Sequence, residues 1–261
     1  AVTGTNGKTS TVQLASQLAA LMGDKSAYIG TLGAGMYSSN SDNQPLNNTI
    51  NTTPDAISMQ RLLAEFVAEG SCQVALEASS HALVQHRIKA VKIDIAIFTN
   101  LSRDHLDYHG SMAEYAAANR FLLCQPELAY VVLNVNDSEH KNWLANVPKT
   151  SFVVLYGHNR NNVDIPSGFK YCLANNVRYT AEGIAISVQS SWGDCELRLS
   201  LLAEFNISNV LAAICSQLCL GKSLKQIAYI VQKLRPVAGR MELYKRQGHA
   251  TIVVDYAHTP D

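Results

Sequence analysis

A short segment near the start of the chain has the residue types and spacing that bind phosphate. Residues 4–10 read GTNGKTS, between an expected strand and an expected helix. Backbone N–H groups of such a turn, together with the dipole of the following helix, cradle phosphate oxygens. Lys8 is suited to neutralise the outer phosphates of a nucleotide, and Thr9 to offer its hydroxyl to magnesium. The candidate phosphate-binding residues are Gly4, Thr5, Asn6, Gly7, Lys8, Thr9 and Ser10.

This segment is not a complete Walker A motif. Val2 stands six residues before Lys8, where that motif has glycine. A glycine-rich turn between a strand and a helix, without a ligand, is therefore the alternative interpretation. The GKT ending in this structural context favours phosphate binding.

A second cluster, LEASSHALVQHR at residues 76–87, begins at the carboxyl end of an apolar strand. Open α/β sheets bind their ligands at that edge. Glu77 is informative because a buried carboxylate is unfavourable unless it is paired or bound to a metal. A magnesium role and an ion pair with a nearby Lys or Arg are equally compatible with the spacing. The polar residues that follow, among them Ser79, Gln85 and Arg87, form either a binding site or merely a polar helix face.

A third cluster, FTNLSRDHLDYHG at residues 98–110, also follows a strand and is rich in titratable groups. His105 is the most interesting of them, since it stands next to Asp104 in a strand-end loop. A surface histidine is the alternative interpretation. No nucleophile elbow or flagged cysteine indicates a Ser-His-Asp or Cys-His enzyme. The titratable residues are Arg103, Asp104, His105, Asp107 and His109.

These clusters require a scaffold in which strands and helices alternate. Apolar runs predict strands at 26–32, 72–79, 93–100, 129–135 and 150–157. Between them we expect helices from Lys8 to about Met22, from an N-cap at Thr53, over 81–87, and from a capping box at Ser111 to Leu123. A polar loop is expected over 33–51. The alternation predicts an α/β fold, with a P-loop-type, mostly parallel sheet flanked by helices.

The pattern changes after Gly157. Alternating apolar and polar residues predict an antiparallel meander at 170–180, 184–191 and 195–201. Helices are expected over 206–220 and 223–234, and a hairpin from Arg240 onward. We expect this hairpin to open a further α/β domain at the C-terminus.

Composition excludes several functions. Lys and Arg total 21 and Asp and Glu total 21, so no basic field exists to hold nucleic acid or an anionic membrane. With no apolar run long enough to span a bilayer and no leader, we expect a cytoplasmic protein. The cysteines lack zinc-type spacing, which indicates reduced thiols: Cys72, Cys124, Cys172, Cys195, Cys215 and Cys219.

Together these strings resemble the Mur ligase family. The resemblance includes FNISN at 205–209, GRME at 239–242 and VVDYAHTPD at 253–261, with NTTPD and the three clusters, in matching order and spacing. It is strongest to the members that add the third amino acid to UDP-N-acetylmuramoyl-L-alanyl-D-glutamate. It implies an ATP-dependent, ADP-forming amide ligase of peptidoglycan precursor synthesis that works through an acyl phosphate. The substrates would be the UDP-N-acetylmuramoyl dipeptide and a diamino acid, meso-diaminopimelate or lysine, and the protein would be a monomer.

The resemblance also assigns roles to residues. ATP and Mg²⁺ would be held by the phosphate loop, with Thr9, Glu77 and His105 as metal ligands. The catalytic residues would be Lys8, Glu77, His105 and Asn119. Nucleotide contacts would come from Asn206, Asn209, Arg240 and Asp255. Residues matching those that grip the muramoyl peptide are Thr52, Thr53, Ser79, Gln85 and Arg87.

One position departs from the family. Many Mur ligases have a lysine nine residues after the glycine of the DYHG string, and its carbamate supports the second magnesium through water. Asn119 occupies that position here. We expect its side-chain oxygen to keep the water-mediated contact; a helix-surface residue without a role is the alternative.

The matched strings predict a central ATP-binding domain over 1–237 and the beginning of a C-terminal ligase domain over 238–261. We expect a fragment that lacks the other parts of the ligase and is inactive alone. Two alternatives remain: a folylpolyglutamate synthase-like enzyme or another Mur ligase, and a P-loop nucleotide-binding switch without ligase chemistry.

Overall fold

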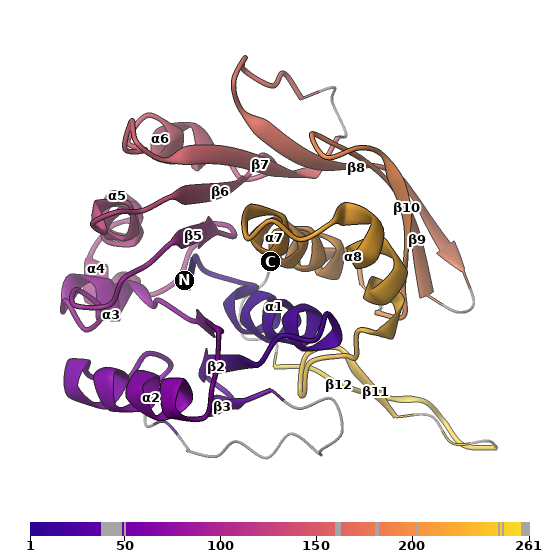
Figure 1. Ribbon diagram of the computed structural model, residues 1–261, viewed down its shortest axis with the longest axis horizontal. Helices are drawn as coiled ribbons and strands as arrows, with labels where there is room; N and C mark the ends of the chain where they lie inside the picture. Colours follow the sequence, from indigo (N-terminus) through magenta and orange to yellow (C-terminus); the bar gives the residue numbers. More distant parts are fainter. Residues whose placement is uncertain are drawn as a thin grey trace.

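The computed structural model describes residues 1–37, 49, 51–159, 163–180, 183–201, 203–244, 246 and 248–256. A curved sheet wraps around helices α1, α7 and α8, while α2, α3, α5 and α6 lie against its outer face (Figure 1). The helices are α1 (Lys8–Leu21), α2 (Ala56–Ala68), α3 (Ser80–Val84), α4 (Leu106–His109), α5 (Met112–Arg120), α6 (His140–Leu144), α7 (Phe205–Cys219) and α8 (Leu224–Ile230). Two 3-10 helices, η1 (Phe121–Cys124) and η2 (Val231–Lys233), continue α5 and α8.

The described strands form three sheets, and the two larger ones are joined at one edge. The seven-stranded sheet has the order β1-β5-β6-β7-β8-β9-β10, and a three-stranded sheet has the order β3-β2-β4. A parallel bridge from Val2 to Glu77 joins β1 to the end of β4. The strands are β1 (Val2–Thr3), β2 (Ser26–Gly30), β3 (Gly33–Met36), β4 (Gln73–Leu76), β5 (Ile95–Phe98), β6 (Tyr130–Asn134), β7 (Phe152–His158), β8 (Lys170–Thr180), β9 (Gly183–Ser190), β10 (Cys195–Leu199), β11 (Glu242–Tyr244) and β12 (Ile252–Val254).

The predicted α/β fold with a mostly parallel sheet and an antiparallel meander is confirmed. Strands β1, β5, β6 and β7 pair in parallel, as do β2 and β4. The meander β8-β9-β10 is antiparallel and extends the same sheet, because β8 pairs in parallel with β7. Strands β11 and β12 form the predicted hairpin, whereas residues 257–261 of the last string lie outside the described residues.

Apolar side chains fill both sides of the sheet. One buried cluster joins α1, α7 and α8 to the inner face, and Leu14, Leu18 and Val210 in it are fully buried. The other packs α2 and the outer helices against the opposite face around Phe66 and Trp143. Because both faces are covered, the parallel strands β5, β6 and β7 are mostly apolar on both sides, as the sequence indicated. No helix in the described ranges is long and apolar enough to cross a membrane.

Three predicted boundaries were wrong. The predicted loop at 33–51 begins with strand β3, which pairs antiparallel with β2; residues 38–48 and 50 lie outside the described residues. The N-cap of α2 is Asp55, which accepts hydrogen bonds from Ile57 N and Ser58 N, both at 3.0 Å. Thr53 does not cap the helix because its hydroxyl is bonded to Glu77 O at 2.7 Å. The N-cap at Ser111 is confirmed, since its hydroxyl accepts from Glu114 N at 3.2 Å. The same hydroxyl donates to Glu114 Oε2 at 3.1 Å, and α5 itself ends at Arg120.

Candidate functional site

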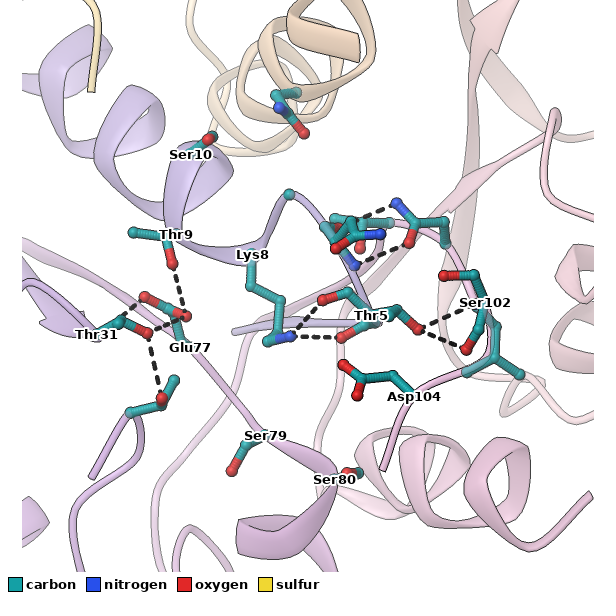
Figure 2. Close-up of a pocket in the computed structure, with 18 of the residues that line it drawn as sticks. Thr5, Lys8, Thr9, Ser10, Thr31, Glu77, Ser79, Ser80, Ser102 and Asp104 are labelled. Carbon is teal, nitrogen blue, oxygen red and sulfur yellow. Dashed lines mark hydrogen bonds between the residues drawn. The ribbon is translucent and has the colours of Figure 1, made fainter. Parts of the chain in front are cut away.

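The parallel strands β1, β2, β4 and β5 end at one edge of the sheet, and a cavity of about 730 Å³ opens there. The loop after β1 forms one wall, and the first turn of α7 lies on the opposite side. Figure 2 shows the polar side chains that gather in it. Of the residues proposed from the sequence, the cavity is lined by Gly4, Thr5, Asn6, Gly7, Lys8, Thr9, Ser10, Thr52, Glu77, Ser79, Arg87, His105, Asn209, Arg240 and Asp255.

The loop before α1 needs glycine at two positions. Gly4 has φ +129° and Gly7 has φ +85°, conformations that side chains rarely adopt. A Cβ at Gly4 would also overlap Thr99 Oγ1 and lie 2.7 Å from Asn100 O. A Cβ at Gly7 would overlap Asn209 Oδ1. The glycines therefore let the loop pass close to β5 and α7.

Asn100 fixes this loop from the end of β5. Its Oδ1 accepts from Asn6 N at 2.9 Å, and its Nδ2 donates to Asn6 O at 3.0 Å. Its own carbonyl accepts from Thr5 N at 2.8 Å. Asn100 lies in the FTN string, but we did not select it as a site residue. A polar amide directly after an apolar strand was the available signal.

The side chain of Lys8 folds back onto the loop that precedes it. Its Nζ donates to Gly4 O and Thr5 O, each at 2.7 Å. Burial lowers the pKa of Lys8, and the negative charges of Glu77 and Asp104 oppose that shift. The ammonium group is thus held at the loop, beside the N–H groups that suit phosphate oxygens.

Glu77 is the buried carboxylate of the site, with 1% of its surface exposed. Its Oε2 accepts from Thr9 Oγ1 at 3.1 Å and from Thr31 Oγ1 at 3.2 Å, and its Oε1 accepts from Thr31 N at 2.8 Å (Figure 2). Burial raises the pKa of Glu77, while the charge of Lys8 and these hydrogen bonds lower it. Among the described residues no Lys or Arg lies within ion-pair distance of it.

Thr31 and Gly30 position Glu77, but the sequence patterns did not lead to either residue. Thr31 supplies two of its three donors, and Gly30 gives it room, because a Cβ there would overlap Glu77 Oε1. Both stand at the carboxyl end of β2, an edge position like those of the selected clusters. That shared edge was the signal that could have identified them.

The residues expected to grip the substrate divide into two groups. Thr52, Ser79 and Arg87 line the cavity, whereas Thr53 and Gln85 lie behind its wall. Thr53 is buried, and its hydroxyl accepts from Ser79 N at 3.0 Å. Gln85 Oε1 accepts from Arg87 Nε at 2.9 Å and from Nη2 at 2.6 Å. Thr53 and Gln85 therefore hold Ser79 and Arg87 in place.

A group of aromatic rings surrounds His105. His81 lies with its ring centroid 5.1 Å from that of His105, and Tyr115 lies at 5.9 Å. Asp104 Oδ2 is 3.5 Å from His105 Nε2. Burial, with the neighbouring His105 and His109, lowers the pKa of His81. His105 lines the cavity and has φ +54°, so the loop, not a regular helix, presents its ring.

Asn119 does not line the cavity. Its side chain is fully buried; its Oδ1 accepts from Thr3 Oγ1 at 2.6 Å and its Nδ2 donates to Tyr115 O at 2.9 Å. Both polar atoms thus bind protein, and Asn119 links α5 to β1. It is not the helix-surface residue of the alternative interpretation, and its water-mediated contact with a metal stays a prediction that these contacts do not support.

The far wall of the cavity comes from α7 and the hairpin. Asn209 lines the cavity, while Asn206 is buried beside it, with its Oδ1 3.4 Å from Asn209 Nδ2. The Arg240 guanidinium lies 5.1 Å from the ring centre of Tyr256. Asp255 Oδ1 accepts from Met241 N at 3.0 Å and ties the two hairpin strands together. These groups face the loop after β1 across the cavity.

The donor set fits magnesium in the presence of a nucleotide. Within the described residues, no three His, Cys, Asp or Glu side chains gather closely enough to hold a metal by themselves. Magnesium commonly takes one or two carboxylates together with phosphate oxygens and water. Glu77 and the Thr9 hydroxyl, 3.1 Å apart next to the phosphate loop, match that pattern.

Comparisons with known proteins find matches along nearly the whole chain. The family model of the Mur ligase middle domain matches residues 2–217. The UDP-N-acetylmuramoyl-L-alanyl-D-glutamate--2,6-diaminopimelate ligase of Vibrio cholerae serotype O1 is 41% identical over 260 residues, covering 100% of this chain and 50% of the relative. A solved structure of a ligase with that name has a TM-score of 0.83 at 33% identity, covering 99% of this chain and 50% of the other. A MurF structure from Acinetobacter baumannii shares the fold, with a TM-score of 0.75 at 17% identity over 99% of this chain and 51% of its own. The chain thus spans about half the length of these relatives.

Proposed function

Since the chain belongs to the Mur ligase family, we propose that it is the ATP-binding central part of a MurE-type, ADP-forming amide ligase. The proposed reaction joins a diamino acid to UDP-N-acetylmuramoyl-L-alanyl-D-glutamate in peptidoglycan precursor synthesis. The name of the relative from Vibrio cholerae favours 2,6-diaminopimelate as that amino acid, with lysine as the other candidate.

One observation carries this proposal. A single cavity joins the phosphate loop, the buried Glu77 carboxylate and the substrate-facing Arg87. A ligase that activates a carboxylate with ATP needs these three features within reach of one another. The phosphate loop alone would equally suit any nucleotide-binding protein.

We propose a reaction in two steps. A carboxylate oxygen of the UDP-linked dipeptide attacks the γ-phosphorus of ATP, which gives an acyl phosphate and ADP. The amine of the diamino acid then attacks the acyl carbon, a proton leaves the nitrogen, and inorganic phosphate departs. Negative charge gathers on phosphate oxygens in the first step, so positioning and electrostatic stabilisation provide most of the catalysis.

The chain's own groups suit that task. Lys8 and the N–H groups at the start of α1 would bind the β- and γ-phosphates, and Arg87 would bind an anionic group of the UDP substrate. Magnesium, when bound, would neutralise phosphate charge and align the reacting oxygens. Thr9 and Glu77 would hold one ion, and His105 would be the protein ligand of a second.

The remaining nucleotide contacts would come from the opposite wall. Asn209 faces the phosphate loop, with Asn206 holding its amide in place. Arg240 and Asp255 would reach the phosphates and ribose from the hairpin. We assign 1–237 to a central ATP-binding domain and 238–261 to the beginning of a C-terminal ligase domain.

The same proposal places the protein in the cytoplasm as a monomer, where UDP-linked precursors and ATP are available. It names no nucleic acid or membrane partner, in keeping with the zero formal net charge. Since this chain spans half of its relatives, we expect it to bind nucleotide weakly and not to form an amide alone.

Release of ADP by the full-length protein separates the alternatives. A MurE-type ligase should release ADP only when the UDP-muramoyl dipeptide and a diamino acid are both present. A folylpolyglutamate synthase-like enzyme would require a folate instead, and another Mur ligase a different UDP precursor. A nucleotide switch would hydrolyse ATP without any amino acid, which would contradict the proposal.

A further inference from the structure

Thr31 makes two hydrogen bonds to the Glu77 carboxylate. Its N–H donates to Oε1 at 2.8 Å and its hydroxyl donates to Oε2 at 3.2 Å (Figure 2). Thr9 supplies the third bond, at 3.1 Å to Oε2. If magnesium binds Thr9 Oγ1 and Glu77, Thr31 is the residue that still orients the carboxylate without binding the metal.

The hydroxyl of Thr31 has a second neighbour. Thr52 Oγ1 lies 3.1 Å from Thr31 Oγ1. A hydroxyl has one hydrogen, and an ionised carboxylate only accepts. Because Thr31 donates its hydrogen to Glu77, it must accept the hydrogen of Thr52. The hydrogen bonds therefore run in one direction, from Thr52 through Thr31 to Glu77.

Thr52 belongs to the segment that precedes α2 and lines the same cavity. The next residue, Thr53, binds Glu77 O at 2.7 Å, so this segment contacts both the backbone and, through Thr31, the side chain of Glu77. Linked hydrogen bonds polarise and strengthen one another. A change at Thr52 should consequently alter the hydrogen bond that Thr31 donates to the Glu77 carboxylate.

We propose that Thr31 is a positioning residue that orients the Glu77 carboxylate for magnesium and couples it to Thr52 in the substrate-facing segment. This inference rests on the proposed function, because it assumes that Glu77 binds magnesium with ATP. Thr31 was not among the site residues selected from the sequence. Its proposed role links the part of the cavity that would bind nucleotide to the part that would bind the UDP substrate.

The test measures binding, not turnover. In the full-length protein, equilibrium dialysis with labelled ATP gives the magnesium concentration at which ATP binding is half-maximal. Thr31→Val keeps the backbone N–H and the side-chain shape but removes the hydroxyl, and it should raise that concentration about tenfold, as loss of an outer-shell partner does. Thr31→Ser keeps the hydroxyl and should restore it to within about threefold.

Thr11→Val is the matched control. Thr11 is fully buried on α1, its hydroxyl has no partner in the described structure, and it does not line the cavity. The same chemical change there should leave magnesium-dependent binding unchanged. Thr31 itself is exposed in the cavity, so its variants should fold, and equal thermal midpoints without ligands would verify this.

A double-mutant cycle tests the coupling. Thr52→Val alone should raise the half-maximal magnesium concentration about threefold, the effect of one neutral hydrogen bond. In the Thr31→Val background it should have no further effect, because the link is already broken. If Thr31→Val matches the unaltered protein, or if the two effects multiply, the inference is wrong.

Failure of the proposed function gives a different result. A full-length protein that binds ATP with magnesium but forms no amide would contradict the ligase, while the cycle would still decide on Thr31. If the unaltered protein shows no magnesium-dependent ATP binding, both proposals fail.

Discussion

Replacing Gly30 with alanine would place a methyl group against the Glu77 carboxylate. A Cβ at this position would overlap Oε1 and lie 2.8 Å from Cδ and 2.9 Å from Cγ of Glu77. Gly30 ends strand β2 and does not have a positive φ. The backbone therefore tolerates alanine, and the three nearest atoms to the new methyl group all belong to Glu77.

The expected loss of stability depends on how far the new methyl group displaces the Glu77 side chain. Glu77 is 1% exposed, so its side chain has no open space to enter. Overpacking of a dense interior typically destabilises by about 1–3 kcal/mol. A displaced carboxylate also loses the bond from Thr31 N at 2.8 Å. Loss of one hydrogen bond to a charged group, about 1.5–3 kcal/mol, would lower turnover about 10- to 100-fold.

Thermal unfolding without ligands measures the first effect, and magnesium-dependent ADP release by the full-length protein measures the second. Glu77→Ala provides the decisive background, because it removes the atoms that the new methyl group meets. In that background Gly30→Ala should leave the free energy of unfolding nearly unchanged. An equal loss of stability in both backgrounds would refute the steric explanation, and full activity of Gly30→Ala would refute the functional one.

Four further changes test individual roles in the full-length protein. Lys8→Ala should lower turnover by roughly two to three orders of magnitude, as for a lost charge-stabilising donor, measured as ADP release at saturating substrates. Arg87→Ala should mainly raise the KM for the UDP substrate, and an equal rise in the KM for ATP would contradict this division. His105→Ala should raise the magnesium requirement more than it alters ATP affinity; an unchanged magnesium titration means that His105 is not a ligand. Asn119→Ala should destabilise the fold by about 1–3 kcal/mol, because Thr3 Oγ1 and Tyr115 O each lose one hydrogen bond. A raised magnesium requirement at unchanged stability would instead support the water-mediated contact.

The order of elements and the edge at which the site forms could be predicted from the sequence. Apolar strands that alternate with amphipathic helices give a parallel sheet, and polar clusters that follow those strands must meet at its carboxyl edge. Glu77 and His105 were selected on that argument, and the structure places both on one cavity. The resemblance added residues distant in the chain, such as Arg240, which no local pattern indicates.

The missed features depend on contacts between segments far apart in sequence. Asp55, not Thr53, caps α2 because Thr53 is already bonded to the backbone at Glu77, and no local pattern reveals that bond. Thr31 and Asn100 look like ordinary strand-end residues until β2 and β5 are aligned beside the phosphate loop. The burial of Asn119 likewise depends on how α5 packs against β1.

Transfer of an oxygen atom tests the central claim most directly. The UDP-muramoyl dipeptide is prepared with oxygen-18 in its acceptor carboxylate and incubated with full-length protein, ATP, magnesium and 2,6-diaminopimelate. A ligase that activates this carboxylate through an acyl phosphate should transfer one labelled oxygen to inorganic phosphate for each ADP and each amide formed. Release of ADP and unlabelled phosphate, without amide product, would contradict the account.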